Sequence, residues 1–340
     1  MTSKRFLIFV FLGLGAVAAV IIPLNMYTDI YGLFRAARGR PVTVYGEERV
    51  AKYLHSFRYI PENFDGVILG SSVSAILDAR DFEGYRIYNA SIDGGNVEDL
   101  KPIAENIFKK GRLKVTIICV HRYLTNDHNQ KTDLITPKEY WGALGSPQLL
   151  TAYVSRMAIG LGLVRARYDE YGTKHFASDP DSSRVRTTIS EAVSGIERGT
   201  ESVGNYYIDP VAFAELRDVL TLARGRSRQL IMFFPPVPAP ILAVRSAEYA
   251  GYREVTSSLL DPHDVVVDFN TPNYENLRSD VRNFVDAVHL SRRGARLVMV
   301  ELAKAASESI APGGTLAGRA MQGGQNSGIM PANAPLVAPR

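Results

Sequence analysis

Short apolar runs of strand length alternate with segments of helical composition through most of this 340-residue chain. Glycine, proline or polar residues bound these runs, as is typical of buried strands. Strands that alternate with helices favour an α/β fold with one parallel sheet. The pattern predicts strands near 66–69, 85–91, 115–120, 229–234 and 265–269, and helices over 47–58, 97–110, 209–224, 247–260 and 291–306.

The alternation is interrupted between residues 124 and 228, where no segment has a strong strand pattern. We expect a mostly helical insertion here that covers one end of the sheet, with an exposed loop over Asp179–Arg186. The stretch is rich in tyrosine and contains Trp141. These aromatic side chains could stack on sugar rings, but their helical spacing favours packing in a core.

The amino terminus carries an apolar segment, Phe6–Leu24, that has no charged residue. Its length is close to the roughly 20 residues that a helix needs to cross a bilayer. Lys4 and Arg5 precede it, which favours a cytoplasmic amino terminus and an extracytoplasmic body. Residues 1–26 are therefore expected to be a membrane anchor. A cleaved signal peptide is the alternative, because Ala16-Val17-Ala18 offers small residues at a suitable spacing.

Composition sets the remaining boundaries. We expect a juxtamembrane connector over 27–60 and one main domain over 61–308. Residues 309–340 are rich in glycine, proline and alanine, which predicts a disordered tail. With 46% hydrophobic and 22% charged residues the chain can build a sizeable core, and a net charge of +4 gives little reason to expect a nucleic-acid partner.

A single cysteine limits the possible metal and redox chemistry. Cys119 lies inside an apolar run, so it can form neither an intrachain disulfide nor a cysteine zinc site. His121 and His128 have no carboxylate–histidine partners at metal-ligand spacing. We therefore expect no metal and no cofactor.

The first candidate for chemistry follows the strand at 66–69. That run stops at Gly70 and leads directly into Ser71 and Ser72, with Ser74 close behind. At the carboxyl edge of a parallel sheet, such a strand–turn–helix junction exposes a side-chain oxygen, so Ser72 is a candidate nucleophile. The alternative is that these serines only cap the following helix.

A second candidate, Asp286 with His289, stands just before the last predicted helix. In a turn, residues at this spacing can project to one side, so that the carboxylate accepts a hydrogen bond from one imidazole nitrogen. The other nitrogen then remains available as a general base for a serine. The alternative is a helix-start carboxylate beside a surface histidine.

Together these segments resemble the SGNH (GDSL-type) hydrolase family of flavodoxin-like serine esterases and acyltransferases. Ile68–Ser74 is similar to the first block of the family, Asn89–Gly94 to its second, and Asp286–Leu290 to its final Asp-x-x-His block. The resemblance implies a three-layer sandwich around a five-stranded parallel sheet. It also implies Ser72 as nucleophile, His289 as base, Asp286 as its orienting acid, and backbone amides of Ser72 and Gly94 in an oxyanion hole.

Two blocks depart from the pattern of the family. Ser71 replaces the usual aspartate, a version that resembles membrane-anchored branches active in D-alanine transfer and alginate O-acetylation. The third block, Gly-x-Asn-Asp, is absent, and Arg122 or Asn126 is the candidate for its oxyanion donor.

The resemblance and the anchor imply an esterase or acyltransferase that acts on O-acyl groups of an extracytoplasmic, periplasmic polysaccharide. A catalytically degenerate domain that binds polysaccharide or a membrane acyltransferase partner is the second hypothesis. A lipid-directed esterase is the third, with Ile159–Val164 lining an acyl channel.

Overall fold

The computed structural model describes residues 3–35, 41–126, 135–176, 181–201 and 206–310. Within these residues five parallel strands form one sheet in the order β2-β1-β3-β4-β5. This is the strand order of flavodoxin-like folds. The strands are β1 Gly66–Leu69, β2 Ile87–Asn89, β3 Leu113–Cys119, β4 Ser227–Phe234 and β5 Val265–Asp268. The predicted α/β fold with a five-stranded parallel sheet is confirmed.

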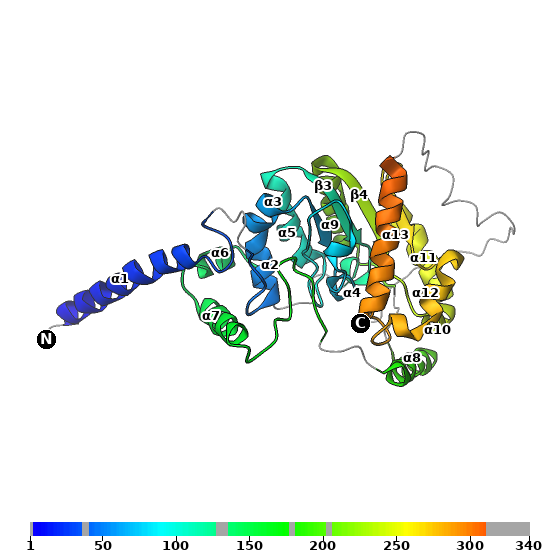
Figure 1. Cartoon of the computed structure of the whole chain (residues 1–340), viewed down its shortest axis with the longest axis horizontal. Coiled ribbons are helices and arrows are strands. Elements are labelled where there is room, and N and C mark those ends of the chain that lie inside the picture. The colour runs from blue at the N-terminus through cyan, green and yellow to red at the C-terminus, as the bar shows by residue number, and fades with distance from the viewer. Residues whose placement is uncertain (1–2, 36–40, 127–134, 177–180, 202–205, 311–340) are drawn as a thin grey trace.

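Helices cover both faces of the sheet (Figure 1). Alternate strand residues face opposite layers, so Val67 and Leu69 pack in one core and Ile68 in the other. The first layer holds α2 Glu48–Phe57, α3 Tyr59–Asn63, α5 Val97–Lys110, α9 Pro210–Arg226 and α11 Ser246–Ser257. The second holds α8 Ser182–Glu197, α10 Ala239–Val244, α12 Glu275–Ser279 and α13 Arg292–Ile310.

Local chemistry explains where the two best-predicted helices begin. At α5, Asn96 and Asp99 form a capping box, in which each side chain accepts a hydrogen bond from the backbone of the other residue. At α9, the Asp209 carboxylate accepts from the backbone N–H of Val211 and of Ala212, and Pro210 occupies the first helical position. Both helix starts are where the sequence predicts them.

Between β3 and β4 the described residues form α6 Lys138–Gly142 and α7 Pro147–Gly160, followed by α8 and α9. The exposed loop predicted over 179–186 is wrong beyond Asp181, because the Asp181 carboxylate caps α8. Val185, Ile189 and Ala192 then recur on one face of α8 and are buried in the core that α8 shares with α10 and α13. Residues 179–180 lie outside the described part of the chain.

The amino-terminal helix α1, Ser3–Thr28, is long and apolar enough to cross a membrane, and its apolar window is not buried against the rest of the protein. The segment after it packs onto the body, since Ile30, Tyr31 and Leu33 are buried in the same core as α2. The connector therefore shares a hydrophobic core with the main domain. The tail predicted to be disordered lies outside the described residues from residue 311 onward.

A histidine in this core links folding to pH. His55 on α2 is fully buried, and its Nδ1 lies 2.8 Å from the Tyr88 hydroxyl oxygen. Burial, and secondarily the charge of Lys52, lowers the pKa of His55 from 6.5 to about 3. The unfolded chain therefore binds a proton below pH 6.5 that the folded protein does not take up until about pH 3.

We expect the free energy of unfolding to fall as the pH drops from 7 to 5, by up to about 1.4 kcal/mol per pH unit for this one group. His55→Asn should reduce that slope, whatever it does to stability at pH 7. Urea unfolding of the detergent-solubilised chain across this pH range measures it. His263→Asn, at an exposed position, is the control; an unchanged slope in His55→Asn would contradict the assignment.

Candidate active site

The turn after β1 presents Ser72 at the carboxyl edge of the sheet. Gly70 must lack a side chain here, because a Cβ would lie 2.1 Å from Ser74 Oγ and 2.8 Å from Cys119 Cβ. The chain then enters the short helix α4, Ser72–Ala75. Ser71 does not cap α4 with its side chain, so the capping interpretation of these serines is not supported at that position.

Buried polar groups of the β2 edge hold this turn. The Asn89 amide nitrogen donates to the carbonyl oxygens of Ser74, Ala75 and Leu77 at 2.8, 3.2 and 3.0 Å. The Ser74 hydroxyl donates to Ser91 Oγ at 2.8 Å. Because Asn89 and Ser74 are fully buried, water cannot replace these bonds when they are lost.

The segment before α13 is a closed loop. Phe284 and Leu290 form an antiparallel bridge, and Val285 N–H donates to the His289 carbonyl oxygen at 2.9 Å. Inside the loop, Asp286 Oδ1 accepts from the backbone N–H of Val288 and of His289, both at 2.7 Å. These hydrogen bonds hold the Asp286 carboxylate on the same side of the loop as the His289 imidazole.

The structure brings the predicted serine, histidine and aspartate together. His289 Nε2 lies 3.0 Å from Ser72 Oγ, and His289 Nδ1 lies 2.8 Å from Asp286 Oδ2. Both distances are within hydrogen-bond reach, which is the geometry required of a nucleophile, a base and an orienting acid. The Ser72 side chain is half-buried, so it remains accessible from solvent.

Two titratable groups around the ring have shifted pKa values. Burial alone would raise the pKa of Asp286, but the hydrogen bond and charge of His289 and the two backbone N–H groups outweigh it and lower this pKa. Burial, with Arg122 and His289 nearby, lowers the pKa of His121 to about 3. Near neutral pH the site therefore holds an ionised Asp286 and an uncharged His121.

His121 is a site neighbour that the sequence did not reveal. Its Nδ1 lies 3.3 Å from Ser71 Oγ, and its ring packs edge-on against Tyr123. The Ser71 hydroxyl and the His121 imidazole therefore lie within hydrogen-bond reach of each other beside the Ser72 turn. The sequence did contain one signal for His121. It follows β3, which pairs in parallel with β1, so it lies at the same edge of the sheet as Ser72.

Gly94 lies on the loop that continues β2 along the nucleophile turn. Ala90 N–H donates to the Ile68 carbonyl oxygen at 2.9 Å, and Ile92 N–H to that of Gly70 at 3.0 Å. Gly94 itself has a φ of +57°, which glycine adopts without strain. The loop thus stays beside the Ser72 turn as far as Ile92 and then bends at Gly94.

Charged side chains brace this loop from two directions. From α2, the ammonium of the buried Lys52 donates to the Ser91 carbonyl oxygen and lies 2.9 Å from Glu48 Oε1. Glu48 Oε2 accepts from the Asp93 N–H at 3.2 Å. From the segment after α7, Lys174 forms an ion pair with the Asp93 carboxylate. None of these roles is visible in the sequence, where charges on a helix suggest a solvated face.

The two candidates for a further oxyanion donor differ in their surroundings. Arg122 lines a cavity of about 30 Å³ together with Val73 and Val288, which neighbour Ser72 and His289 in the chain. Its guanidinium also donates to the Tyr123 hydroxyl at 3.1 Å. Asn126 is buried and is not among the residues that line this cavity. Of the two candidates, Arg122 is thus the one that shares a cavity with the chain neighbours of Ser72 and His289.

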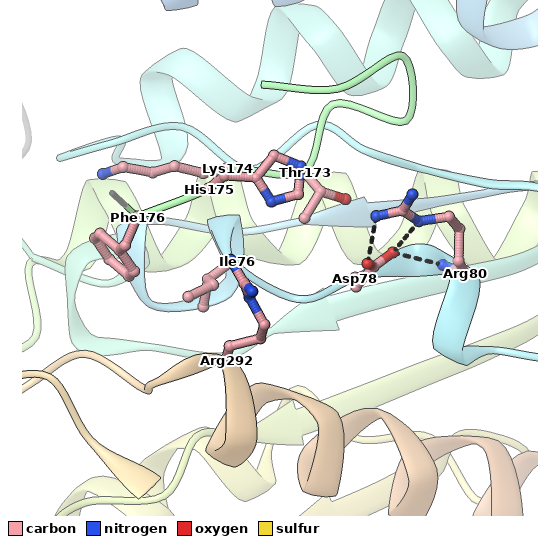
Figure 2. A pocket seen from close by; sticks show the side chains of 8 residues that line it. All are labelled: Ile76, Asp78, Arg80, Thr173, Lys174, His175, Phe176 and Arg292. Carbon is pink, nitrogen blue, oxygen red and sulfur yellow. Dashed lines mark hydrogen bonds and ion pairs between the residues drawn. The ribbon is translucent and has the colours of Figure 1, made fainter. Parts of the chain in front are cut away.

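A larger cavity of about 270 Å³ lies between the end of α4 and the start of α13 (Figure 2). Arg292 extends into it from the first turn of α13, toward Ile76. Lys174, His175 and Phe176 form the opposite wall, and Asp78 binds Arg80 at one end. Ile76 ends the helix that begins at Ser72, but Ser72, Asp286 and His289 do not line this cavity. Its volume is slightly below the roughly 300–1,000 Å³ of pockets that bind drug-sized ligands.

Two further expectations can be compared with the structure. Leu161, Leu163 and Val164 are exposed at 66%, 73% and 51%, so 159–164 lies on the surface and does not line an acyl channel. Within the described residues no group of three or more histidine, cysteine or acidic side chains is arranged to hold a metal ion. His128 lies outside the described residues.

Gly70→Ala should destabilise the protein by about 1–3 kcal/mol, because the new methyl group would overpack the contact between Ser74 and Cys119. It should also displace Ser72 from His289. Urea unfolding measures the first effect, and the rate at which a fluorophosphonate modifies Ser72 measures the second. Gly111→Ala is the matched control, since a Cβ there would meet no atom within 4 Å. Equal behaviour of the two variants would contradict this role of Gly70.

Comparison with known proteins was made by sequence and by structure. No protein-family model matches the chain, and no curated protein matches its sequence. One solved structure that aligns with it comes from Streptococcus pneumonia and is provisionally described as a platelet activating factor. It is 11% identical, covers 77% of this chain and 90% of its own, and gives a TM-score of 0.38.

Proposed function

We propose that this protein is a serine esterase or O-acyltransferase that acts on O-acyl groups of an extracytoplasmic polysaccharide. The observation that supports it is the hydrogen-bonded series from Ser72 Oγ through the His289 ring to Asp286, at 3.0 and 2.8 Å. The three groups come from two segments that meet at one edge of the sheet. Such an arrangement activates a serine hydroxyl, which is otherwise a weak nucleophile.

In the first half-reaction, Ser72 Oγ attacks the carbonyl carbon of an ester and His289 Nε2 takes the hydroxyl proton. Asp286 accepts a hydrogen bond from His289 Nδ1–H and stabilises the imidazolium that forms. The tetrahedral intermediate then expels the alcohol, which takes the proton from His289. The acyl group is left on Ser72 as an ester.

The negative charge on the tetrahedral oxygen needs donors that are already in place. The backbone N–H groups of Ser72 and Gly94 are the proposed donors, with Arg122 or Asn126 as a further one. The contacts of Lys52, Glu48 and Lys174 with residues 91–93 support this role, because they restrict the loop that carries Gly94. Loss of one donor typically lowers such rates by a hundredfold or more.

In the second half-reaction, His289 removes a proton from an acceptor hydroxyl, which attacks the acyl carbon and releases Ser72. Water as acceptor gives an esterase, and a sugar hydroxyl gives a transferase. The cavity between the end of α4 and the start of α13 offers space for part of the substrate, although Ser72, Asp286 and His289 do not line it. The apolar helix α1 supports a site held at a membrane, on its extracytoplasmic side, where acylated polysaccharides or a membrane acyltransferase partner can reach it.

A fluorophosphonate should modify Ser72, because the probe reacts with a serine hydroxyl that a base has activated. The adduct should disappear in Ser72→Ala and persist in Ser257→Ala, where the replaced side chain is exposed. Mass spectrometry of the labelled full-length chain in detergent gives the position. A folded protein without an adduct would reject the enzyme and favour a domain that only binds polysaccharide.

Hydrolysis of a chromogenic acetyl ester should fall on the order of a thousandfold or more in Asp286→Asn, because the amide can hold the wrong tautomer of His289. The effect should appear in kcat, with KM changed little. Asp280→Asn, which changes a carboxylate bound to Arg282 and Arg293 on the surface, is the control. Similar losses in both variants would show that the effect is not specific to the imidazole.

A further inference from the structure

The helix α7 presents an apolar stripe to solvent. Leu150, Val154, Met157 and Leu161 are exposed at 65%, 53%, 60% and 66%. Their spacing of four, three and four residues places them within about 60° of one another around a helix that turns about 100° per residue. The opposite side of α7 is already used, since Leu149 and Ala152 are buried against the body. α7 thus has two apolar faces, one that packs on the body and one, the stripe, that is exposed to solvent.

The helix α7 lies near the end of α1 that meets the body (Figure 1). The Asn25 amide of α1 donates to the Leu144 carbonyl oxygen at 2.6 Å, and the Tyr153 hydroxyl of α7 donates to Asn25 Oδ1 at 3.0 Å. A Cβ on Gly145 would lie 4.0 Å from Ile21. The α6–α7 segment is thus attached to the last two turns of α1.

The length of α1 indicates where this attachment would lie relative to a bilayer that α1 spans. Phe6 follows the last charged residue before the apolar run, and from Phe6 to Asn25 a helix rises about 28 Å. The hydrocarbon core of a bilayer is about 30 Å thick. Asn25, and with it α7, would then lie at the boundary between hydrocarbon and headgroups.

The side chains around the stripe suit that boundary. Trp141 on α6 is 68% exposed, and Tyr27 at the end of α1 is 69% exposed. Tryptophan and tyrosine are enriched where membranes meet water. Arg156, Arg165 and Arg167 are exposed on α7 and just after it, and cationic side chains there are attracted to anionic lipid headgroups.

We infer that α7 lies in the membrane interface, with the stripe of Leu150, Val154, Met157 and Leu161 inserted among the lipids that surround α1. This rests on the proposed anchoring by α1. The protein would then contact the bilayer at two places, one spanning and one interfacial.

Nitroxide labels on the full-length protein test this in vesicles of phosphatidylethanolamine with phosphatidylglycerol as the minor component. Single cysteines replace Met157, Leu14 in the middle of α1, and Val255, an exposed residue of α11 far from α1. The native Cys119 is buried, and unsubstituted protein serves as the blank. Oxygen concentrates in lipid, whereas a nickel chelate stays in water. Comparing how strongly each reagent broadens the spectrum of a label therefore shows whether that label lies in lipid or in water.

The label at 157 should resemble the one at 14, with oxygen several-fold more effective than nickel, and the label at 255 should show the reverse. In the Met157→Cys protein, Val154→Glu should shift the label toward water, whereas Thr151→Glu, exposed but off the stripe, should not. A label at 157 that behaves like 255 while 14 remains in lipid overturns the inference and leaves the anchor intact. A label at 14 in water rejects the anchoring itself. A third outcome is that neither oxygen nor nickel reaches the label at 157, and that the label shows spin–spin broadening which disappears when unlabelled protein is added. That result would mean that the stripe packs against a second copy of the protein, and it would also overturn the inference.

Discussion

The hydrogen bonds on the two nitrogens of the His289 ring are the constraint on which this site depends. They join Asp286, three residues away, to Ser72, which is 217 positions away in the chain. Such a contact exists only if β1 and the loop before α13 end at the same edge of the sheet. Gly70 supports it by letting the nucleophile turn pack against Cys119, and Asn89 by binding three carbonyl oxygens after Ser72. A proton can pass between Ser72 and His289 only while this framework keeps them within hydrogen-bond distance.

The fold and the central groups of the site could be predicted because their signals are local. Apolar runs bounded by glycine or proline mark the strands, and Asn96 and Asp209 mark helix starts with cap side chains. Ser72 follows a strand directly, and Asp286 and His289 share one short loop, so each pattern stands within a few residues. The two patterns are 217 positions apart, and only the resemblance to the SGNH hydrolase family joined them in the sequence.

The remaining features could not be predicted because they depend on tertiary packing. Lys52 looks like one of the solvated charges of α2, yet it is fully buried and binds Glu48 and the Ser91 carbonyl oxygen. His121 looks like a structural residue at the end of β3, yet it lies beside Ser71 and has an altered pKa. The start of α8 could not be predicted, because a serine- and arginine-rich stretch resembles a loop until neighbouring segments such as α10 supply an apolar surface for Val185 and Ile189. In each case the partner lies far away in the chain.

The attachment of α1 to the body has a mechanical consequence. Asn25 is nearly inaccessible to solvent and bonds to both Leu144 and Tyr153, so a bend at this junction would leave an amide without partners in a place that water hardly reaches. In the proposed membrane-anchored state, these two hydrogen bonds would restrict how far the body can tilt relative to α1. Ser72 would then stay at a nearly constant distance from the membrane surface, and the proposed polysaccharide substrate would have to reach that distance to react.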